Sequence, residues 1–349
     1  MRLVVSYRGV PKAAGWEAGA CLARAFRELG HDVTDYGTYY GESPSRRVAD
    51  RGLPSEINLW VYVECGDSER QYEEVRTVNA RAKVYWEFDT AIHRGFSLDF
   101  IQRMQFDHVF LGNWREADMV RTVHSQVHFL PYAVTADRLA ILSGTPKTLD
   151  VGMVGMETRS RRRLMNALQR AGISAAILQN RYGDELVKTI NSFKICLNCE
   201  VTGGKGLLNG RLWESLGCGG FLLNERGNGI ETVFENGRHL VLFATEADCV
   251  AKARYYLDHP REAEGIARAG HEYAMAHHTY RQRAEAMLTA MAAPIASARR
   301  APLARRFRAF LLRSAYRALG HVPRLARHDA AGAVAMPDPL GVSQEKHTG

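Results

Sequence analysis

Residues 194–223 read KICLNCEVTGGKGLLNGRLWESLGCGGFLL. The stretch opens with an apolar run that predicts a strand, passes through a glycine-rich loop at 202–210, and continues into helical spacing from Arg211. Three closely spaced glycines end the helix, and a second apolar run follows at 220–225. Strand, glycine-bearing loop, helix and strand in this order are the repeating unit of a parallel α/β sheet.

The same unit recurs on both sides of this stretch. The first half contains expected strands at 2–7, 31–37, 58–64, 82–86, 108–112 and 127–134, with helical stretches between them at 16–30, 70–80 and 97–105. A second series of alternating strands and helices starts near residue 149 and ends near residue 290. The two series are joined by residues 135–148. We therefore expect two αβ halves with a cleft between them, and ligands at the carboxyl ends of the strands.

Length and composition are those of an ordinary globular protein. A chain of 349 residues is longer than one hydrophobic core usually serves, so two domains are expected. The content of 46% hydrophobic and 24% charged residues excludes a disordered or collagen-like chain. No run approaches the ~18 uncharged apolar residues of a membrane span, and the apolar run before Arg8 is too short for a signal peptide. We expect a cytoplasmic protein.

The 6 cysteines fit that location, because cytoplasmic thiols stay reduced. The only C-x-x-C pair, Cys196 and Cys199, lies on an expected strand, where side chains three residues apart point to opposite faces. The pair therefore cannot grip one metal ion, and we expect buried, reduced cysteines.

The positive charge is concentrated in one segment. The net charge is +8, and residues 299–327 hold nine Arg and no Lys, Asp or Glu, so subtraction leaves −1 for the rest of the chain. A nucleic-acid-binding protein carries its charge on its working face, so we expect no nucleic acid partner. Apolar residues of this segment share one helical face, which suits an anionic membrane surface. A helix packed on the first half, or a solvated tail, are the alternatives.

A family resemblance rests on the segment 209–223, in which Arg211, Glu214 and Gly219 have the spacing R-x-x-E-x-x-x-x-G. This segment is similar to GT-B glycosyltransferases of the glycosyltransferase group 1 type, and in particular to the CgeB-like (spore maturation protein-like) family. Further stretches follow in the family's order, namely 109–113, 130–132, 151–155, 159–163, 194–198, 231–243, 253–260, 266–270 and 277–281. The resemblance covers roughly residues 1–290 and is most specific over 194–281.

The resemblance implies a GT-B fold, in which two Rossmann-like αβα domains face each other across a cleft. Residues 1–140 would form the acceptor domain and residues 148–290 the nucleotide-sugar donor domain, with 291–349 as a basic amphipathic helix and disordered tail. The implied activity is transfer of a sugar from a nucleotide-sugar to an acceptor hydroxyl of a glycan, lipid-linked or small molecule. No cofactor is expected, because the nucleotide-sugar is a substrate. Rival interpretations are a non-catalytic nucleotide-sugar or glycan-binding protein of the same fold, and a periplasmic binding protein.

The resemblance also assigns donor contacts. A carboxylate at Glu214 can accept hydrogen bonds from both hydroxyls of a ribose, and the guanidinium of Arg211 can neutralise a diphosphate. The alternatives are a carboxylate that complements the helix dipole and an ion pair between the two residues. The remaining expected donor-side residues are Lys194, Asn198, Lys205, Gly155 and Arg161.

One position departs from the best-known pattern. Many retaining members carry another glutamate upstream of the one at the Glu214 position, with seven residues between the two. In this chain the upstream position is Gly206. The sequence therefore leaves open whether transfer is retaining or inverting. It also leaves open the sugar, the base, the acceptor and the oligomeric state.

On the acceptor side, Asp89 and His93 follow an expected strand at the end where a cleft would lie, and either can act as general base. The alternatives are a helix-capping Asp and a surface His. The chain has no D-x-D motif, and cations with helix N-termini can meet a diphosphate. We therefore expect no metal site.

Overall fold

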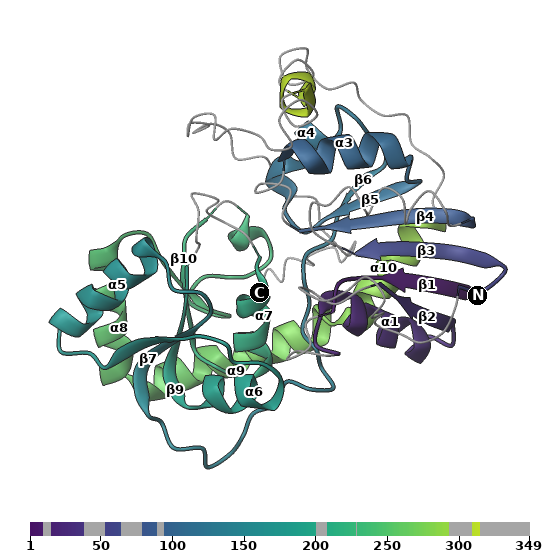
Figure 1. Ribbon diagram of the computed structural model, residues 1–349. Coiled ribbons are helices and arrows are strands. Elements are labelled where there is room, and N and C mark those ends of the chain that lie inside the picture. The colour runs from purple at the N-terminus through teal and green to yellow at the C-terminus, as the bar shows by residue number, and fades with distance from the viewer. Residues whose placement is uncertain are drawn as a thin grey trace, which may run out of the picture.

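The computed structural model describes residues 1–9, 15–37, 53–63, 79–88, 94–199, 208–227, 229–292 and 309–314. These residues form two α/β lobes, each built on its own parallel sheet (Figure 1). The strands of the first lobe are β1 (Arg2–Ser6), β2 (Asp32–Tyr36), β3 (Ile57–Val63), β4 (Ala80–Glu87), β5 (His108–Leu111) and β6 (Val127–Phe129). The strands of the second lobe are β7 (Leu149–Val154), β8 (Ala175–Leu178), β9 (Phe193–Asn198), β10 (Leu222–Glu225) and β11 (Val241–Phe243).

The first sheet has the strand order β2-β1-β3-β4-β5-β6, and each pair of neighbouring strands in it is parallel. Its central strands are apolar runs because both of their faces are covered. In β3, for example, six of seven residues are buried. The helices of this lobe are α1 (Ala18–Glu28), α3 (Arg94–Met104), the 3-10 turn η2 (Trp114–Glu116) and α4 (Ala117–Val120).

The second sheet has the order β11-β10-β9-β7-β8, again parallel throughout. Its helices are α5 (Arg159–Arg170), α6 (Gly183–Asn191), α7 (Gly210–Gly217), the 3-10 turn η3 (Ile230–Thr232), α8 (Glu246–Asp258) and α9 (Pro260–His277). The apolar faces of α5 and α8 share one buried cluster with β7, β9, β10 and β11. This arrangement puts the start of α5 and of α7 at the carboxyl edge of the sheet.

The last described helix of this series, α10 (Tyr280–Ala292), returns to the first lobe. It packs along α1, and its residues Tyr280, Ala284 and Met287 are buried in the same cluster as β1 and β3. The chain thus crosses between the lobes twice, and the two crossings are joined by a bridge between Val134 and Thr279. Residues 280–290 of the expected donor domain therefore complete the first lobe.

Other expectations can be placed on the fold. The helical stretch expected at 70–80 lies largely outside the described residues, and β4 already begins at its last position. Cys21, Cys196, Cys199, Cys218 and Cys249 are buried, as expected, and none of them forms a disulfide within the described part of the chain. Across these same residues, every helix is too short or too polar to cross a membrane.

Candidate functional site

Two arginines meet at the carboxyl edge of the second sheet. Gly155 directly follows β7 and has a φ of +138°, a backbone conformation that favours glycine. A Cβ placed on Gly155 would lie 3.5 Å from Nη1 of Arg211 and 3.6 Å from Nη1 of Arg161. Two guanidinium groups therefore converge on the backbone of a residue that has no side chain, and such an arrangement can bind an anion.

Arg161 is fully buried in the first turn of α5. Its Nη2 donates to the carbonyl oxygen of Cys199 at 2.9 Å, and its Nη1 donates to the carbonyl oxygen of Met156 at 2.7 Å. The side chain thus fixes the loop after β7 to the end of β9. It adds positive charge to the site from a position that cannot move freely.

Arg211, in the first turn of α7, is the more available of the two. Its Nε donates to Oδ1 of Asn198 at 3.2 Å, and Asn198 also receives a hydrogen bond from Asn209, the N-cap of α7. The amide of Asn198 in turn donates to Asn224 on β10 at 2.7 Å. Within the described residues neither Nη group of Arg211 has a hydrogen-bond partner. A fixed arginine with two open donor groups is suited to bind a diphosphate.

Glu214 lies one turn further along α7, in the second turn of the helix. Burial raises the pKa of its carboxyl, and the nearby charge of Arg211 opposes that rise. Its carboxylate has no hydrogen-bond partner among the described residues. An acceptor held in this way can take hydroxyl hydrogen bonds from a ligand.

The other expected residues separate into two groups. Lys194 is the second residue of β9, at the opposite edge of the sheet, and it pairs with Asp150 at 2.7 Å, so the structure does not bring it to Gly155 and Arg211. Lys194 precedes Asn198 by four residues on the same strand, which puts it about 13 Å nearer the amino edge of the sheet. Lys205, Asp89 and His93 lie outside the described residues.

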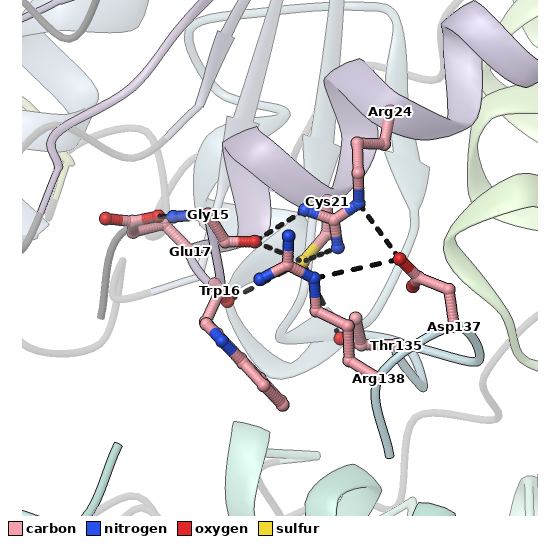
Figure 2. A network of polar contacts seen from close by, with 8 residues as sticks. All are labelled: Gly15, Trp16, Glu17, Cys21, Arg24, Thr135, Asp137 and Arg138. Atoms are coloured by element: carbon pink, nitrogen blue, oxygen red, sulfur yellow. Dashed lines mark hydrogen bonds and ion pairs between the residues drawn. The ribbon is translucent and has the colours of Figure 1, made fainter. Parts of the chain in front are cut away.

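The opposing face of the first lobe carries a polar network that the sequence did not predict (Figure 2). Arg24 on α1 pairs with Asp137 at 3.2 Å and donates to the carbonyl oxygen of Gly15. Asp137 also lies 3.7 Å from Arg138, whose guanidinium covers the indole of Trp16 at 5.4 Å from the ring centroid. The network ties the loop before α1 to the chain that leaves the first lobe.

Cys21 lies at the centre of this network. Its thiol contacts Thr135 at 3.6 Å, and burial raises the pKa of the thiol, although Arg24 opposes that rise. At neutral pH the thiol is therefore protonated, and it serves as a small packed side chain.

Trp16 is the point where this face meets the second lobe. A Cβ placed on Gly183, at the start of α6, would lie 3.4 Å from Nε1 of Trp16. Trp16 precedes α1 and follows β1, whereas Gly183 follows β8, so loops from the carboxyl ends of both sheets touch here. The two edges therefore face each other, and Arg211 lies on one while Arg24 and Arg138 lie on the other.

Sequence reasoning missed Arg24, Asp137 and Arg138 because their partners are far away in the chain. Arg24 and Asp137 are separated by more than a hundred residues, and each resembles any other charged residue of a helix or loop. The one available signal was Gly15, whose φ of +82° lets Arg138 approach its backbone. Among the described residues no group of three His, Cys, Asp or Glu is arranged to hold a metal ion.

Known proteins resemble this chain at two levels. Residues 159–289 match the model of a family described as glycosyl transferase-like, a range that includes Arg161, Asn198, Arg211 and Glu214. No curated protein sequence is significantly similar to the chain. At the level of structure, sucrose-phosphate synthase from Thermosynechococcus elongatus is similar with a TM-score of 0.58 at 11% identity, covering 83% of this chain and 98% of that one.

Two further structures hold ligands. Anabaena Alr3699/HepE in complex with UDP and glucose has a TM-score of 0.57 at 9% identity, covering 83% of this chain and 99% of its own. The T4 phage enzyme BGT in complex with UDP-glucose has a TM-score of 0.58 at 11% identity, covering 84% and 100%. These likenesses confirm the two-lobed GT-B fold. The matched domain is that of a glycosyltransferase.

Proposed function

We propose that the protein transfers a sugar from a nucleotide-sugar donor to a hydroxyl group of an acceptor. The observation that carries the proposal is the convergence of two arginines of the matched range, Arg161 and Arg211, on Gly155, which lies just before that range. In this assignment Arg211 binds the diphosphate and Glu214 accepts hydrogen bonds from the ribose. The acceptor would approach from the first-lobe face, near Trp16 and Arg138.

UDP is the first nucleotide to test, because HepE and BGT were crystallised with UDP or UDP-glucose. Thermal shift with UDP, GDP, CMP and ADP would identify the nucleotide, since a ligand that binds only the folded state raises its stability by mass action. A panel of nucleotide-sugars would then be assayed for release of the free nucleotide. Specific binding without release would favour the second candidate, a non-catalytic nucleotide-sugar or glycan-binding protein.

The proposed reaction needs no metal, because among the described residues it is two arginines, Arg161 and Arg211, that converge on Gly155, where the diphosphate would bind. We expect nucleotide release to continue in EDTA at its original rate. BGT has also been crystallised with UDP and Mn²⁺, so the experiment discriminates between two real options. Loss of activity in EDTA with recovery in Mn²⁺ would contradict this part of the proposal.

The finer assignments rest on sequence resemblance. One is membership of the CgeB-like family, whereas Gly206 leaves open whether transfer retains or inverts the anomeric configuration. Asp89 and His93, which follow an expected strand, are the proposed bases on the acceptor side. Product anomeric configuration, read by NMR, tests retention directly. Substitution of each base candidate by Asn tests its role, and unchanged turnover in both variants would exclude both.

We further propose a cytoplasmic enzyme that binds the inner face of the membrane through residues 299–327. The described part of this segment, 309–314, is helical and places Ala309 and Leu312 in a buried cluster with first-lobe residues. Phe310 and Leu311 are 54% and 48% exposed. Two exposed apolar side chains within a segment of nine arginines suit an anionic lipid surface.

A further inference from the structure

A buried arginine lies where the two lobes join. Arg283, in the first turn of α10, is fully buried. Burial lowers the pKa of its guanidinium to about 9, so the group stays charged at neutral pH. No carboxylate forms an ion pair with it among the described residues. A buried charge of this kind depends on its hydrogen bonds, so the groups that accept them fix its position.

Those acceptors come from both crossings between the lobes. Nε of Arg283 donates to the carbonyl oxygen of Pro131 at 2.9 Å, and Nη2 donates to that of Tyr132 at 3.1 Å. Both carbonyls belong to the chain that leaves the first lobe. Nη2 also donates to Nδ1 of His278, on the returning chain, at 3.0 Å. One side chain therefore ties the outgoing and the returning chain together.

The second lobe contacts the same side chain. The guanidinium of Arg283 lies 5.5 Å from the ring centroid of Trp213, and the His278 ring lies 5.1 Å from the same indole. Trp213 is on α7, between Arg211 and Glu214. The helix that presents the candidate donor residues thus rests on Arg283.

The hydrogen bonding of this cluster is incomplete. Nη1 of Arg283 and Nε2 of His278 are both buried without a partner in the described part of the chain. Burial lowers the pKa of His278 to about 2, so the ring is neutral, and its Nδ1 accepts from Arg283, which places the ring proton on Nε2. Buried donors without acceptors cost free energy. The hydrogen bonds of Arg283 to Pro131, Tyr132 and His278 therefore hold the two crossings together while two donor atoms stay unsatisfied.

We infer that Arg283 is a positioning residue, which sets the angle between the lobes and hence the distance from Arg211 and Glu214 to the first-lobe face. The inference rests on the proposed function, because transfer needs donor and acceptor groups from different lobes. Reacting atoms must approach to about 3–3.5 Å, and a misplacement of 1 Å can cost about 100-fold in rate. The nucleotide itself binds within the second lobe and does not need that alignment.

The experiment compares the variants Arg283→Met and Arg283→Lys with the control Arg281→Met. Arg281 lies on the same helix, is 52% exposed and pairs only with Glu285 among the described residues. We expect both Arg283 variants to bind UDP within about twofold of the wild-type Kd while nucleotide release falls roughly 10- to 100-fold. A single lysine amine cannot reach the Pro131, Tyr132 and His278 acceptors together, so Arg283→Lys should recover only part of the rate. Small-angle scattering should show a broader distribution of lobe separations for Arg283→Met than for Arg281→Met.

Several results would overturn the inference. Normal nucleotide release by Arg283→Met is one such result. Another is an equal loss of UDP affinity and of release rate, because general destabilisation of the protein would lower both. Unfolding of both Arg283 variants where Arg281→Met folds would assign the residue to stability alone. A wild-type protein that neither binds nor releases any nucleotide would instead contradict the proposed function, and the scattering comparison would still test the lobe angle.

Discussion

At the scale of single residues, Glu214 faces opposing requirements. A carboxylate binds ribose hydroxyls best when it is ionised, whereas burial favours its protonated form and raises its pKa. Arg211 compensates by favouring the ionised form. Loss of the Arg211 charge would therefore raise the pKa of Glu214 further.

Substitution Glu214→Ala should weaken nucleotide binding by about 1.5–3 kcal/mol, the usual scale for hydrogen bonds to a charged group. In the wild type, affinity should fall as the pH drops through the raised pKa of Glu214, and calorimetry at several pH values would show this loss. The variant should have a flatter pH profile. Glu264→Ala, an exposed position on α9, is the control. Equal affinity of the folded Glu214→Ala variant and the wild type would exclude the ribose assignment.

The same residue should limit stability in the absence of ligand. Because the folded-state pKa of Glu214 is raised, ionisation above its unfolded value of about 4.3 costs folding free energy. Glu214→Gln should therefore raise the Tm of the ligand-free protein at pH 7, and the gain should vanish near pH 4. A lower Tm at pH 7 would mean that the ionised carboxylate is compensated in the folded state.

At the scale of elements, the N-terminus of α7 connects folding to binding. Asn209 caps the helix by accepting from the N–H of Leu212 at 3.3 Å, and its amide also donates to Asn198 at 3.3 Å. The cap therefore stabilises the helix and holds the side chain to which Arg211 is bonded. Thr245 performs only the first task, at the start of α8.

The variants Asn209→Ala and Thr245→Ala should each lose about 1 kcal/mol of stability, as is usual for a helix cap. Only Asn209→Ala should also lose nucleotide affinity, by roughly 2- to 10-fold, because one hydrogen bond that orients Asn198 disappears. Chemical denaturation and calorimetry measure the two effects. Equal affinities in the two variants would show that the Asn198 network does not support the site.

The elements also show what a sequence can predict. Most strands are separate apolar runs, so the two sheets were predictable. Arg161, Asn198 and Arg211 came from the family resemblance, and the structure places all three at one edge of the second sheet. The destination of α10 was not predictable, because its apolar face would fit either lobe. The link between Arg24 and Asp137 was hidden for a similar reason, since long-range ion pairs leave no periodic pattern.

At the scale of the whole molecule, charge is divided between a near-neutral body and a basic tail. Each arginine near an anionic leaflet contributes about 1 kcal/mol, so three or four suffice for measurable binding. The combined change Arg305→Gln, Arg306→Gln and Arg308→Gln, or the pair Phe310→Ser and Leu311→Ser, should reduce binding to anionic liposomes. Turnover of a soluble acceptor should be unchanged.

Salt should weaken that liposome binding steeply, since screening acts over about 10 Å at 0.1 M. Truncation after Met291 is a less selective test, because it also removes Ala309 and Leu312, which are buried. Neutral liposomes are the control. A wild-type protein that ignores anionic liposomes at low salt would exclude the membrane partner.

The return of α10 to the first lobe determines the order in which the protein is completed during synthesis. The second lobe is one continuous segment, and its sheet can form as soon as its own strands have left the ribosome. The first lobe is translated earlier, yet α1 stays uncovered until Tyr280, Ala284 and Met287 emerge. The part of the chain that is made first is therefore finished last, and a nascent chain stalled before residue 280 would expose the apolar face that α10 later covers.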